Sequence, residues 1–597
     1  FEIGKRHNLE KINIFTEEAK VNENGGKYKG LTREEARRAV VKDLESEGLL
    51  EKTETHSLIL GRCYRCDTLV EPYLSLQWFM SMKALAKPAI KAVEEKKVKF
   101  TPNNWEKIYF DWMHNIRDWC ISRQIWWGHQ IPVWYCNSCS EEIASTEVPK
   151  ECPKCNSLEL KQDENVLDTW FSSALWPFST LGWPKKTDEL RYFYPTNLLV
   201  TSHDIIFFWI ARMIMMGLHF MDDVPFSEVY INALVRDVHG KKMSKSKGNV
   251  IDPMQIIDKY GTDALRLTLT ALSVQGRDMF LSEERIEGYR NFCNKIWNAS
   301  RFILMNLEED IKSEAIEPSV ETLFDEWIFS RYSKMCTDVR NSLDSYNFSK
   351  AVKSLYNFFW DDFCDWYIEI SKMFIHKGSQ EQKINSLKNL LYILDGFLRL
   401  IHPIMPFITE EIWQKLPHKG ESIMISPYPK DEPDWINEEK EKQMEMVKNV
   451  IIDIRTIRSE LSISPVRKIE VLLKVSKKSF ASFYSQYQDF ISQLVGAERI
   501  GIGVDIIKPS QSAVAVQEDV EIYLPLSGLI NLHEEKARIE NNIKDVDEEL
   551  KKVEKKLGNK SFIQKAPENI VEKQRIKLET LEAKKEKLNN LLSFLKE

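Results

Sequence analysis

Four lysines crowd one short stretch of the chain, in "VRDVHGKKMSKSKGN" at residues 235–249. They fall within seven residues, between glycines and serines: Lys241, Lys242, Lys245 and Lys247. Ammonium groups this close repel one another, so the stretch is either a solvated surface turn or the binding site of an anion. Lysines are mobile point charges that can stabilise the charge developing on a leaving pyrophosphate, which makes a triphosphate the expected ligand. The hydroxyls of Ser244 and Ser246 would add donors to such a site.

A second cluster consists of cysteines. "CNSC" (Cys136, Cys139) and "CPKC" (Cys152, Cys155) are separated by twelve residues. Two CxxC turns can present four sulfurs to one point, which suits a tetrahedral, structural Zn²⁺ site; the alternative is a knuckle without metal.

A third pair stands apart, in "CYRC" (Cys63, Cys66). No second pair lies near it in the sequence, so it is either packed thiols or half of a metal site whose partners lie elsewhere.

Composition limits the classes of protein that can carry these clusters. The chain has 597 residues, of which 43% are apolar and 29% charged, and a net charge of -7. Its length predicts three to five domains, since domains usually have about 50–250 residues. The net charge argues against a generally basic nucleic-acid binder but allows local basic patches. Six of the ten cysteines fall in CxxC pairs, which favours metal binding in a reducing compartment and a cytoplasmic protein.

The most apolar run is "IIFFWIARMIMMGLHFM", from Ile205 to Met221. It is shorter than the roughly 20 residues that span a bilayer, and Arg212 lies in its middle. We therefore expect a buried helix and no membrane partner.

The order of apolar patterns predicts α/β and α domains in succession. Residues 165–285 alternate strand-like runs such as "EVYINALV" with helix-like runs such as "DALRLTLTAL", which indicates a parallel α/β sheet. Residues 286–440 are helical throughout and predict a helix bundle. Residues 445–525 resemble a small α/β unit. Near the beginning, "LTREEARRAVVKDLESEGLL" predicts an amphipathic helix with Thr32 as N-cap.

The last segment has the clearest periodicity. Apolar residues follow a 4–3 heptad spacing from Leu532 to Leu557, and a second register runs from Val571 to Leu595. Gly558 would end the first helix and Pro567 would begin the second. The pattern predicts an antiparallel coiled-coil hairpin, either simply solvated or serving as an arm for a large anionic partner.

These motifs together resemble a known family. "KMSKS" (Lys242 to Ser246) is similar to the signature loop of class I aminoacyl-tRNA synthetases. Three further stretches resemble the valyl-tRNA synthetases within that class: "DWCISRQIWWGHQIPVWYC" (118–136), "VLDTWFSSALWPFSTLGWP" (166–184) and "TSHDIIFFWIARM" (201–213). The resemblance extends from "GRCYRCDTLVEPYLSLQWF" through "HPIMPFITEEIW" to the terminal hairpin.

The resemblance implies a multidomain fold. It predicts the second part of a Rossmann-type catalytic domain at 61–285, with a zinc knuckle at 135–160. A remnant of an editing insertion would precede it at 1–60. A helical anticodon-binding domain would follow at 286–440, then a small α/β junction at 441–525 and a coiled-coil tRNA-binding arm at 526–597.

The resemblance also implies roles for single residues. Lys242 and Lys245 would stabilise the transition state in which the valine carboxylate attacks the α-phosphate of ATP. The whole ATP-binding loop would comprise Lys242, Met243, Ser244, Lys245 and Ser246. Trp170 and Ile205 match positions that line the valine pocket, although both could be ordinary core residues. Asp204 would meet the substrate ammonium. The helix that carries Asn294, Lys295, Trp297 and Arg301 would contact tRNA, with Trp297 expected in the core.

The implied reaction joins L-valine to tRNA(Val) through valyl-adenylate, with ATP, Mg²⁺ beside the phosphates, and a structural Zn²⁺. An apolar pocket rejects the near-isosteric threonine by only about 100-fold, so the family adds an editing domain. We expect a monomer. Two alternatives remain at this point: an isoleucyl-type synthetase, which shares the lysine loop, and a tRNA-binding protein without catalysis.

Two family features are missing from this sequence. It contains no HIGH-type tetrapeptide, since "MHNI" and "GHQI" are placed differently, and it contains only what resembles the closing segment of the editing domain. We therefore interpret the chain as a fragment of such an enzyme.

Because half of the expected ATP site is absent from the sequence, we predict that these 597 residues alone do not activate valine. The measurement is valine-dependent exchange between ATP and labelled pyrophosphate. Exchange above the level without valine would contradict this prediction.

Overall fold

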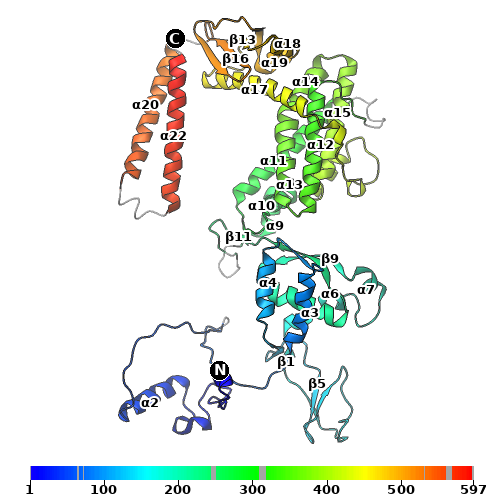
Figure 1. The fold of residues 1–597 in the computed structure, drawn as a ribbon, viewed down its shortest axis with the longest axis vertical. Helices are drawn as coiled ribbons and strands as arrows, with labels where there is room; N and C mark the ends of the chain where they lie inside the picture. The colour runs from blue at the N-terminus through cyan, green and yellow to red at the C-terminus, as the bar shows by residue number, and fades with distance from the viewer. Residues whose placement is uncertain are drawn as a thin grey trace. The chain divides into compact units, whose positions relative to one another are not determined.

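A computed structural model describes residues 2–63, 66–71, 73–241, 243, 250–307, 317–529, 532–559 and 568–594. The described chain forms two compact units, Phe1–Ile231 and Asn232–Glu597. Figure 1 shows the elements of each unit.

The predicted helix near the beginning is confirmed as α2 (Arg33–Ser46), after the short α1 (Glu2–Arg6). Thr32 is its N-cap and forms a capping box with Glu35: the backbone N–H of Thr32 donates to Glu35 Oε2 at 2.9 Å. Two otherwise unsatisfied backbone donors are thereby paired at the first turn. Farther along, Arg33 Nη1 donates to the carbonyl of Leu69 at 3.0 Å.

The core of the first unit is a small α/β assembly. Its sheet has the order β2 (Lys99–Thr101), β10 (Phe226–Asn232), β9 (Thr196–Ser202), and β2 and β10 pair in parallel. The helices of this core are α3 (Met82–Glu94), α4 (Trp105–His114) and α8 (Arg212–Phe220). A parallel pairing is therefore present, with Phe100 opposite Val229, but β2 lies outside the range 165–285 in which the sheet was predicted.

The long apolar run forms a continuous helical segment of three kinds: η2 (His203–Ile205), the π-helix η3 (Ile206–Ala211) and α8. By length and composition alone, His203–Phe220 could cross a membrane. Half of it is buried in this unit, as is common for a core helix of a soluble protein. Ile210, Met213 and Ile214 are completely buried.

Around the core, short strands position the motif residues. These are β1 (Phe79–Met80) with β3 (Trp119–Cys120), and β4 (Ser122–Arg123) with β8 (Val166–Leu167), both pairs antiparallel. A three-stranded antiparallel sheet, β6 (Glu142–Ala144), β5 (Val133–Cys136) and β7 (Leu160–Gln162), carries the paired cysteine turns.

The second unit begins with β11 (Val235–Arg236), which pairs with β12 (Met279–Phe280). Helices follow from Pro253 on, and those from Glu283 onward match the bundle predicted from about residue 286. Their bounds are α9 (Pro253–Tyr260), α10 (Thr262–Leu272), α11 (Glu283–Asn306), α12 (Leu323–Asp344), α13 (Phe348–Asn357), π-helix η6 (Phe358–Tyr367), α14 (Ile368–Lys377), α15 (Gln380–Ile401), α16 (Pro406–Trp413) and α17 (Glu438–Glu460).

A polar network lies inside this bundle. Asp325, 8% exposed, accepts hydrogen bonds from Tyr367 Oη at 2.7 Å and Asn389 Nδ2 at 3.0 Å. Its other oxygen accepts from the backbone N–H and the hydroxyl of Thr322 at the beginning of α12. A buried carboxylate is tolerated only when its lone pairs are occupied, so these bonds fix α12, η6 and α15 in one arrangement.

The predicted small α/β unit is confirmed after α17. Its four-stranded sheet has the order β14 (Ala497–Gly503), β13 (Ile469–Val475), β16 (Val520–Pro525), β15 (Ser512–Val516). Helices α18 (Lys478–Gln486) and α19 (Gln488–Val495) connect β13 to β14. Its buried residues continue the core of the helix bundle.

The chain ends in two long helices that pack along each other, α20 (Leu532–Leu557) and α22 (Glu568–Phe594) (Figure 1). Val546, Leu550, Val553 and Leu581 form their buried seam. Lys585 Nζ lies 2.7 Å from Asp547 and Lys577 Nζ lies 3.4 Å from Glu549, so later residues of α22 meet earlier residues of α20. Pro567 and Leu595 lie outside the described residues.

Candidate functional site

Asp168, in the motif "LDTWFSS", is 6% exposed, and its carboxylate accepts hydrogen bonds from three other residues. Its Oδ2 accepts hydrogen bonds from Trp119 Nε1 at 3.0 Å and from Arg123 Nη2 at 2.6 Å. Its Oδ1 accepts from the backbone N–H of Trp170 at 3.3 Å and so caps α5 (Thr169–Ala174). One carboxylate therefore connects β3, β4 and the helix that carries Trp170.

Trp170 is half-buried on α5, and its ring stacks with that of Phe208 at 6.0 Å and 26°. Ile205, also half-buried, lies three residues before Phe208 at the junction of η2 and η3. Trp209 of the same π-helix donates its Nε1–H to the carbonyl of Ser173 on α5 at 3.0 Å. Single π turns are frequent at functional sites. This one is joined to α5 by the Phe208–Trp170 stacking and the Trp209–Ser173 hydrogen bond, and Ile205 directly precedes it.

Behind this group lies a buried cation, Arg212, which is 5% exposed. Its Cζ lies 3.6 Å from the centre of the Trp119 ring, with Phe207 and Phe208 at 5.5 and 5.7 Å. Burial lowers the pKa of Arg212 to about 10, against the opposing effect of the Asp168 charge, so it remains charged at neutral pH. The cation–π contact with Trp119 compensates in part for the lost hydration.

Asp204 is exposed and accepts a hydrogen bond from the hydroxyl of Ser202. His203 stacks on Trp105 at 4.8 Å and 13°. The predicted substrate-side residues thus follow one another on one turn, with Asp204 facing solvent and Ile205 partly covered.

Most of the lysine loop lies outside the described residues: Lys242, Ser244, Lys245, Ser246 and Lys247. Met243 is described and packs in the second unit against a cluster that includes Ile256, Leu265 and Ile286.

The strand that leads into the loop is well fixed. Arg236 Nε donates to Asp278 Oδ2 at 2.5 Å, across the β11–β12 pair. Asp237 Oδ1 accepts from the backbone N–H groups of His239 and Lys241 at 2.9 and 2.8 Å. Gly240, with φ of 77°, allows the left-handed turn between them.

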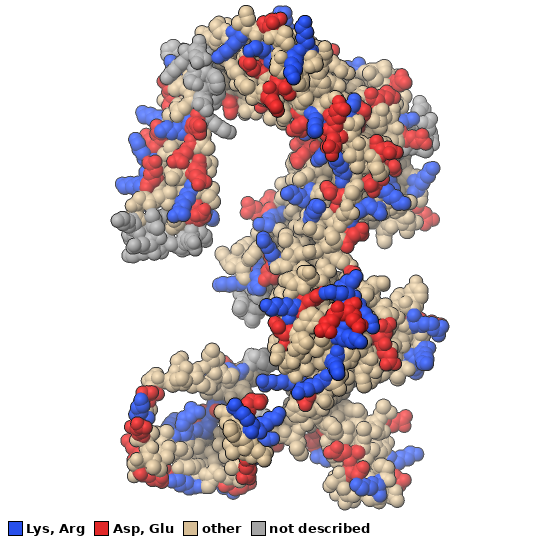
Figure 2. Space-filling model, in the orientation of Figure 1, with Lys and Arg blue, Asp and Glu red and all other residues tan. Residues whose placement is uncertain are grey.

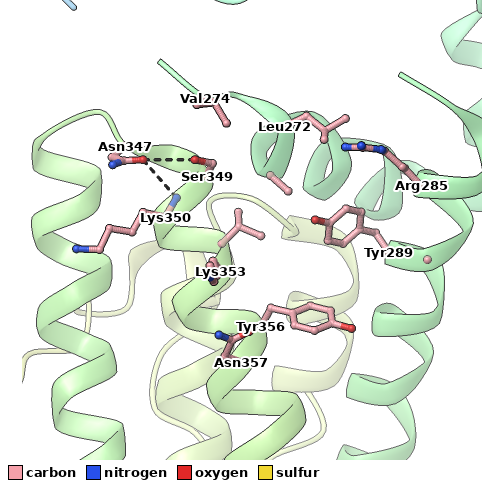
Figure 3. A pocket seen from close by; sticks show the side chains of 13 residues that line it. Leu272, Val274, Arg285, Tyr289, Asn347, Ser349, Lys350, Lys353, Tyr356 and Asn357 are labelled. Atoms are coloured by element: carbon pink, nitrogen blue, oxygen red, sulfur yellow. Dashed lines mark hydrogen bonds between the residues drawn. The ribbon is translucent and has the colours of Figure 1, made fainter. Parts of the chain in front are cut away.

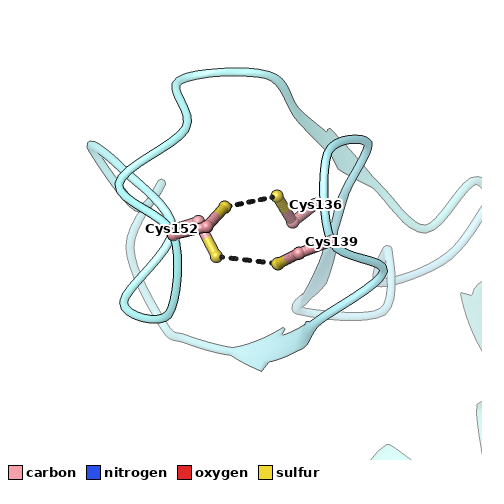
Figure 4. Close-up of side chains that lie close together, drawn as sticks. Cys136, Cys139 and Cys152 are labelled. Carbon is pink, nitrogen blue, oxygen red and sulfur yellow. Dashed lines mark hydrogen bonds between the residues drawn. The ribbon is translucent and has the colours of Figure 1, made fainter.

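The four cysteines of the paired motifs converge (Figure 4). Their Sγ atoms all lie within 4.8 Å of one another, with 3.5 Å between Cys136 and Cys155 and 3.6 Å between Cys139 and Cys152. This arrangement fits a tetrahedral metal ion with thiolate ligands, because no disulfide joins them and each CxxC turn supplies two sulfurs. Cys63 and Cys66 do not join this cluster.

The helix predicted to contact tRNA is the second half of α11. Trp297 is 42% exposed, so the prediction that it is a core residue is wrong. Lys415 Nζ lies 5.6 Å above its ring, and both residues line a small apolar hollow with Arg301. Lys295 instead pairs with Asp365 at 2.8 Å.

Three residues of this site, Asp168, Phe208 and Arg212, were not predicted from the sequence. A signal for Asp168 was present, since an aspartate directly before a helix is a typical N-cap. The other two are ordinary members of an apolar run, and only their packing distinguishes them.

Comparison with known families agrees with this organisation. Residues 8–282 match the family "tRNA synthetases class I (I, L, M and V)". Residues 325–473 match "Anticodon-binding domain of tRNA ligase", and residues 531–596 match "Valyl tRNA synthetase tRNA binding arm".

Two curated relatives are similar over nearly the whole chain. A valine–tRNA ligase of Geobacter sulfurreducens is 49% identical over 592 residues, which are 98% of this chain and 67% of the relative. One of Thermotoga maritima is 50% identical over 596 residues, 100% of this chain and 67% of the relative. The chain thus spans about two thirds of their length.

The arrangement around Asp168 predicts a measurable loss of stability in Asp168→Asn. The amide removes the charge that Arg123 and the buried Arg212 face, and we expect the free energy of unfolding of the first unit to fall by about 2–3 kcal/mol. Urea unfolding followed by tryptophan fluorescence would measure it.

The matched control is Asp188→Asn, which removes the exposed partner of Arg191, 3.3 Å away. This change should cost at most about 0.5 kcal/mol. Equal effects of the two substitutions would contradict the role given to Asp168.

Proposed function

The chain belongs to the valyl-tRNA synthetase family, and from that premise we propose how its residues serve the ATP-dependent ligation of L-valine to tRNA(Val). The observation that carries the function is an identity of about 50% to valine–tRNA ligases over the whole chain. Both relatives are valine-specific by name, which disfavours the isoleucyl alternative.

We propose that Trp170 and Ile205 line the pocket for the valine side chain. An indole face and a branched aliphatic group suit a small branched substrate, and both residues keep partly exposed surface. Trp170 lies on α5, and Ile205 directly precedes the π-helix that contacts α5. Asp204, exposed on the same turn, would receive the substrate ammonium. The aromatic packing behind them would keep this pocket in one shape before the substrate arrives.

Lys242 and Lys245 would stabilise the charge that develops when the valine carboxylate attacks the α-phosphate and pyrophosphate leaves. The other loop residues, Met243, Ser244 and Ser246, would help to hold ATP, with Mg²⁺ neutralising phosphate charge. Catalysis of this kind depends on positioning and electrostatics more than on a proton-transferring base. The fixed stem at Arg236 and Asp237 supports the proposal, because it would hold the beginning of the loop in place beside its ligand.

We propose that Cys136, Cys139, Cys152 and Cys155 hold one structural Zn²⁺ ion. Four thiolates leave no open position, so the ion would stabilise the β5–β6–β7 sheet without a catalytic role. Cys63 and Cys66 would need ligands beyond this cluster. We propose a reducing, cytoplasmic location, because six of the ten cysteines fall in CxxC pairs.

For tRNA, we propose that the helices from residue 286 to 440 read the anticodon region and that the α20–α22 pair acts as a coiled-coil arm. The junction at 441–525 would connect them, after the catalytic part at 61–285 and the editing remnant at 1–60. Acidic and basic side chains alternate along the helix pair (Figure 2). Its contact with RNA would therefore be local, and supported by phosphate contacts of individual lysines and arginines.

The test is filter binding of this chain to a tRNA(Val) transcript and to a non-cognate tRNA at the same salt concentration. We expect at least a tenfold preference for tRNA(Val), and affinity that falls steeply as salt rises. Equal affinity for the two RNAs, with a native circular dichroism spectrum, would contradict the proposal.

Zinc binding makes a separate prediction. The purified chain should contain one zinc per molecule by mass spectrometry of the metal, and Cys152→Ser should lose it and lower the melting temperature. Cys336→Ser, which changes a buried cysteine in the helix bundle, is the control and should keep its zinc. Full zinc content in Cys152→Ser would exclude the four-cysteine site.

A further inference from the structure

A hollow of about 810 Å³ opens in the second unit between the end of α10, the first turns of α11 and one side of α13, from its N-cap to its last residue. Figure 3 shows the side chains that line it. Its volume is in the range of sites that bind small molecules or single nucleotides. None of the residues assigned above to valine, ATP or zinc belongs to it.

Two tyrosines form its aromatic wall, Tyr289 from α11 and Tyr356 from α13 (Figure 3). The Tyr356 ring stacks on Trp360 at 5.5 Å and 11°, and lies 4.6 Å from Phe292. Tyr289 meets Tyr356 edge-on at 6.4 Å and 85°. Packing therefore fixes the Tyr356 ring, and the two tyrosines meet at nearly a right angle. A planar ring can stack on one of them and have the other beside it, at little cost in side-chain entropy.

Three polar side-chain groups that line the hollow are available to hydrogen-bond a ligand. Neither tyrosine hydroxyl has a hydrogen-bond partner among the residues that the structure describes, and the same holds for the Asn357 amide. Burial raises the pKa of both tyrosines, so both are neutral donors at physiological pH. Asn347 is occupied as the N-cap of α13, where its Oδ1 accepts from the backbone N–H of Lys350 at 3.4 Å.

The charges of the lining have one sign. It includes Arg285, Lys350 and Lys353 and no aspartate or glutamate, in a chain whose net charge is -7. Lys350 lies 4.0 Å from Asp338, whereas Arg285 and Lys353 have no ion pair within the described part of the chain. Glu283, close to Arg285 in sequence, is engaged with Lys259 at 2.6 Å. The N-terminus of α13 adds a partial positive charge at the same rim.

We propose that this hollow binds one unstacked nucleotide, with its base against Tyr289 and Tyr356 and its phosphate at Arg285 and Lys353. Inorganic phosphate alone would leave the apolar wall of Leu272 and Val274 in contact with water, and a neutral apolar ligand would leave the cations unused. Aromatic stacking on splayed bases combined with cationic phosphate contacts is the usual chemistry of single-stranded RNA recognition.

The same chemistry could be supplied by a nucleotide of the bound tRNA or by a free mononucleotide. The first source rests on the proposed function, and the second does not. The experiment therefore has two arms on the same purified chain, and every variant is first checked by thermal melting.

In the first arm, filter binding to a tRNA(Val) transcript is measured over a range of salt concentrations. Arg285→Glu and Lys353→Glu should each weaken binding by about tenfold and reduce the slope of log K against log salt by about 1. Val274→Trp, at an exposed position of the lining, should fill the hollow and weaken binding without changing the slope. The control is Arg290→Glu, on the same helix but outside the lining, which should change affinity less than twofold.

In the second arm, equilibrium dialysis measures binding of labelled AMP and UMP to the unmodified chain and to Val274→Trp. Saturable binding that Val274→Trp abolishes would identify a free nucleotide as the ligand. An effect in the tRNA arm alone would identify a tRNA nucleotide.

The inference is overturned if all pocket variants bind tRNA(Val) as the unmodified chain does and no mononucleotide binding depends on Val274. This outcome differs from a failure of the proposed function, in which the unmodified chain itself does not distinguish tRNA(Val) from a non-cognate tRNA.

Discussion

A buried carboxylate at Asp168 is the constraint on which the region around Trp170 depends. A charge removed from water must be fully paired, and here the donors are an indole, a guanidinium and a backbone N–H in the first turn of a helix. Because these donors come from three separate segments, satisfying the charge also fixes their relative positions. The backbone N–H of Trp170 donates to Asp168. The need to pair this buried charge therefore also helps to hold Trp170, which is proposed to line the valine pocket.

A second buried, hydrogen-bonded carboxylate lies in the helical unit. Asp325 is buried and paired with Tyr367, Asn389 and Thr322, and it joins α12 to two elements distant in sequence. In both places a polar group within an apolar core selects one packing arrangement, since any shift would leave a charge unsatisfied. A rigid bundle of this kind can keep a hollow open between α10, α11 and α13, and can hold Tyr356 flat against Trp360.

In the proposed reaction, the lysines of the loop act on ATP and the residues on packed helices recognise valine. The lysines that would act on ATP follow a stem that Arg236 and Asp237 pin in place, while the groups proposed to recognise valine lie on packed helices. Recognition of a small branched side chain needs fixed walls, whereas charge stabilisation during pyrophosphate departure suits the long side chain of lysine, whose ammonium can follow the phosphates. The net negative charge of the chain does not oppose RNA binding, because basic groups are concentrated locally, as around Arg285 and Lys353.

Local sequence patterns by themselves determined much of this protein. Thr32 with Glu35 marks a helix start, CxxC pairs bring two sulfurs together within four residues, and heptads specify a helix pair, because each depends on neighbours within one or two turns. The family resemblance of the motifs added the reaction and the candidate residues. Tertiary structure alone decided the rest: that Asp168 meets Trp119 and Arg123, that Trp297 is exposed, and that Tyr289 and Tyr356 share an acid-free hollow. The contacts of Asp168 and of the two tyrosines join residues about 45 to 70 positions apart, and the exposure of Trp297 depends on which face of α11 is covered. Both are determined only when the whole core packs.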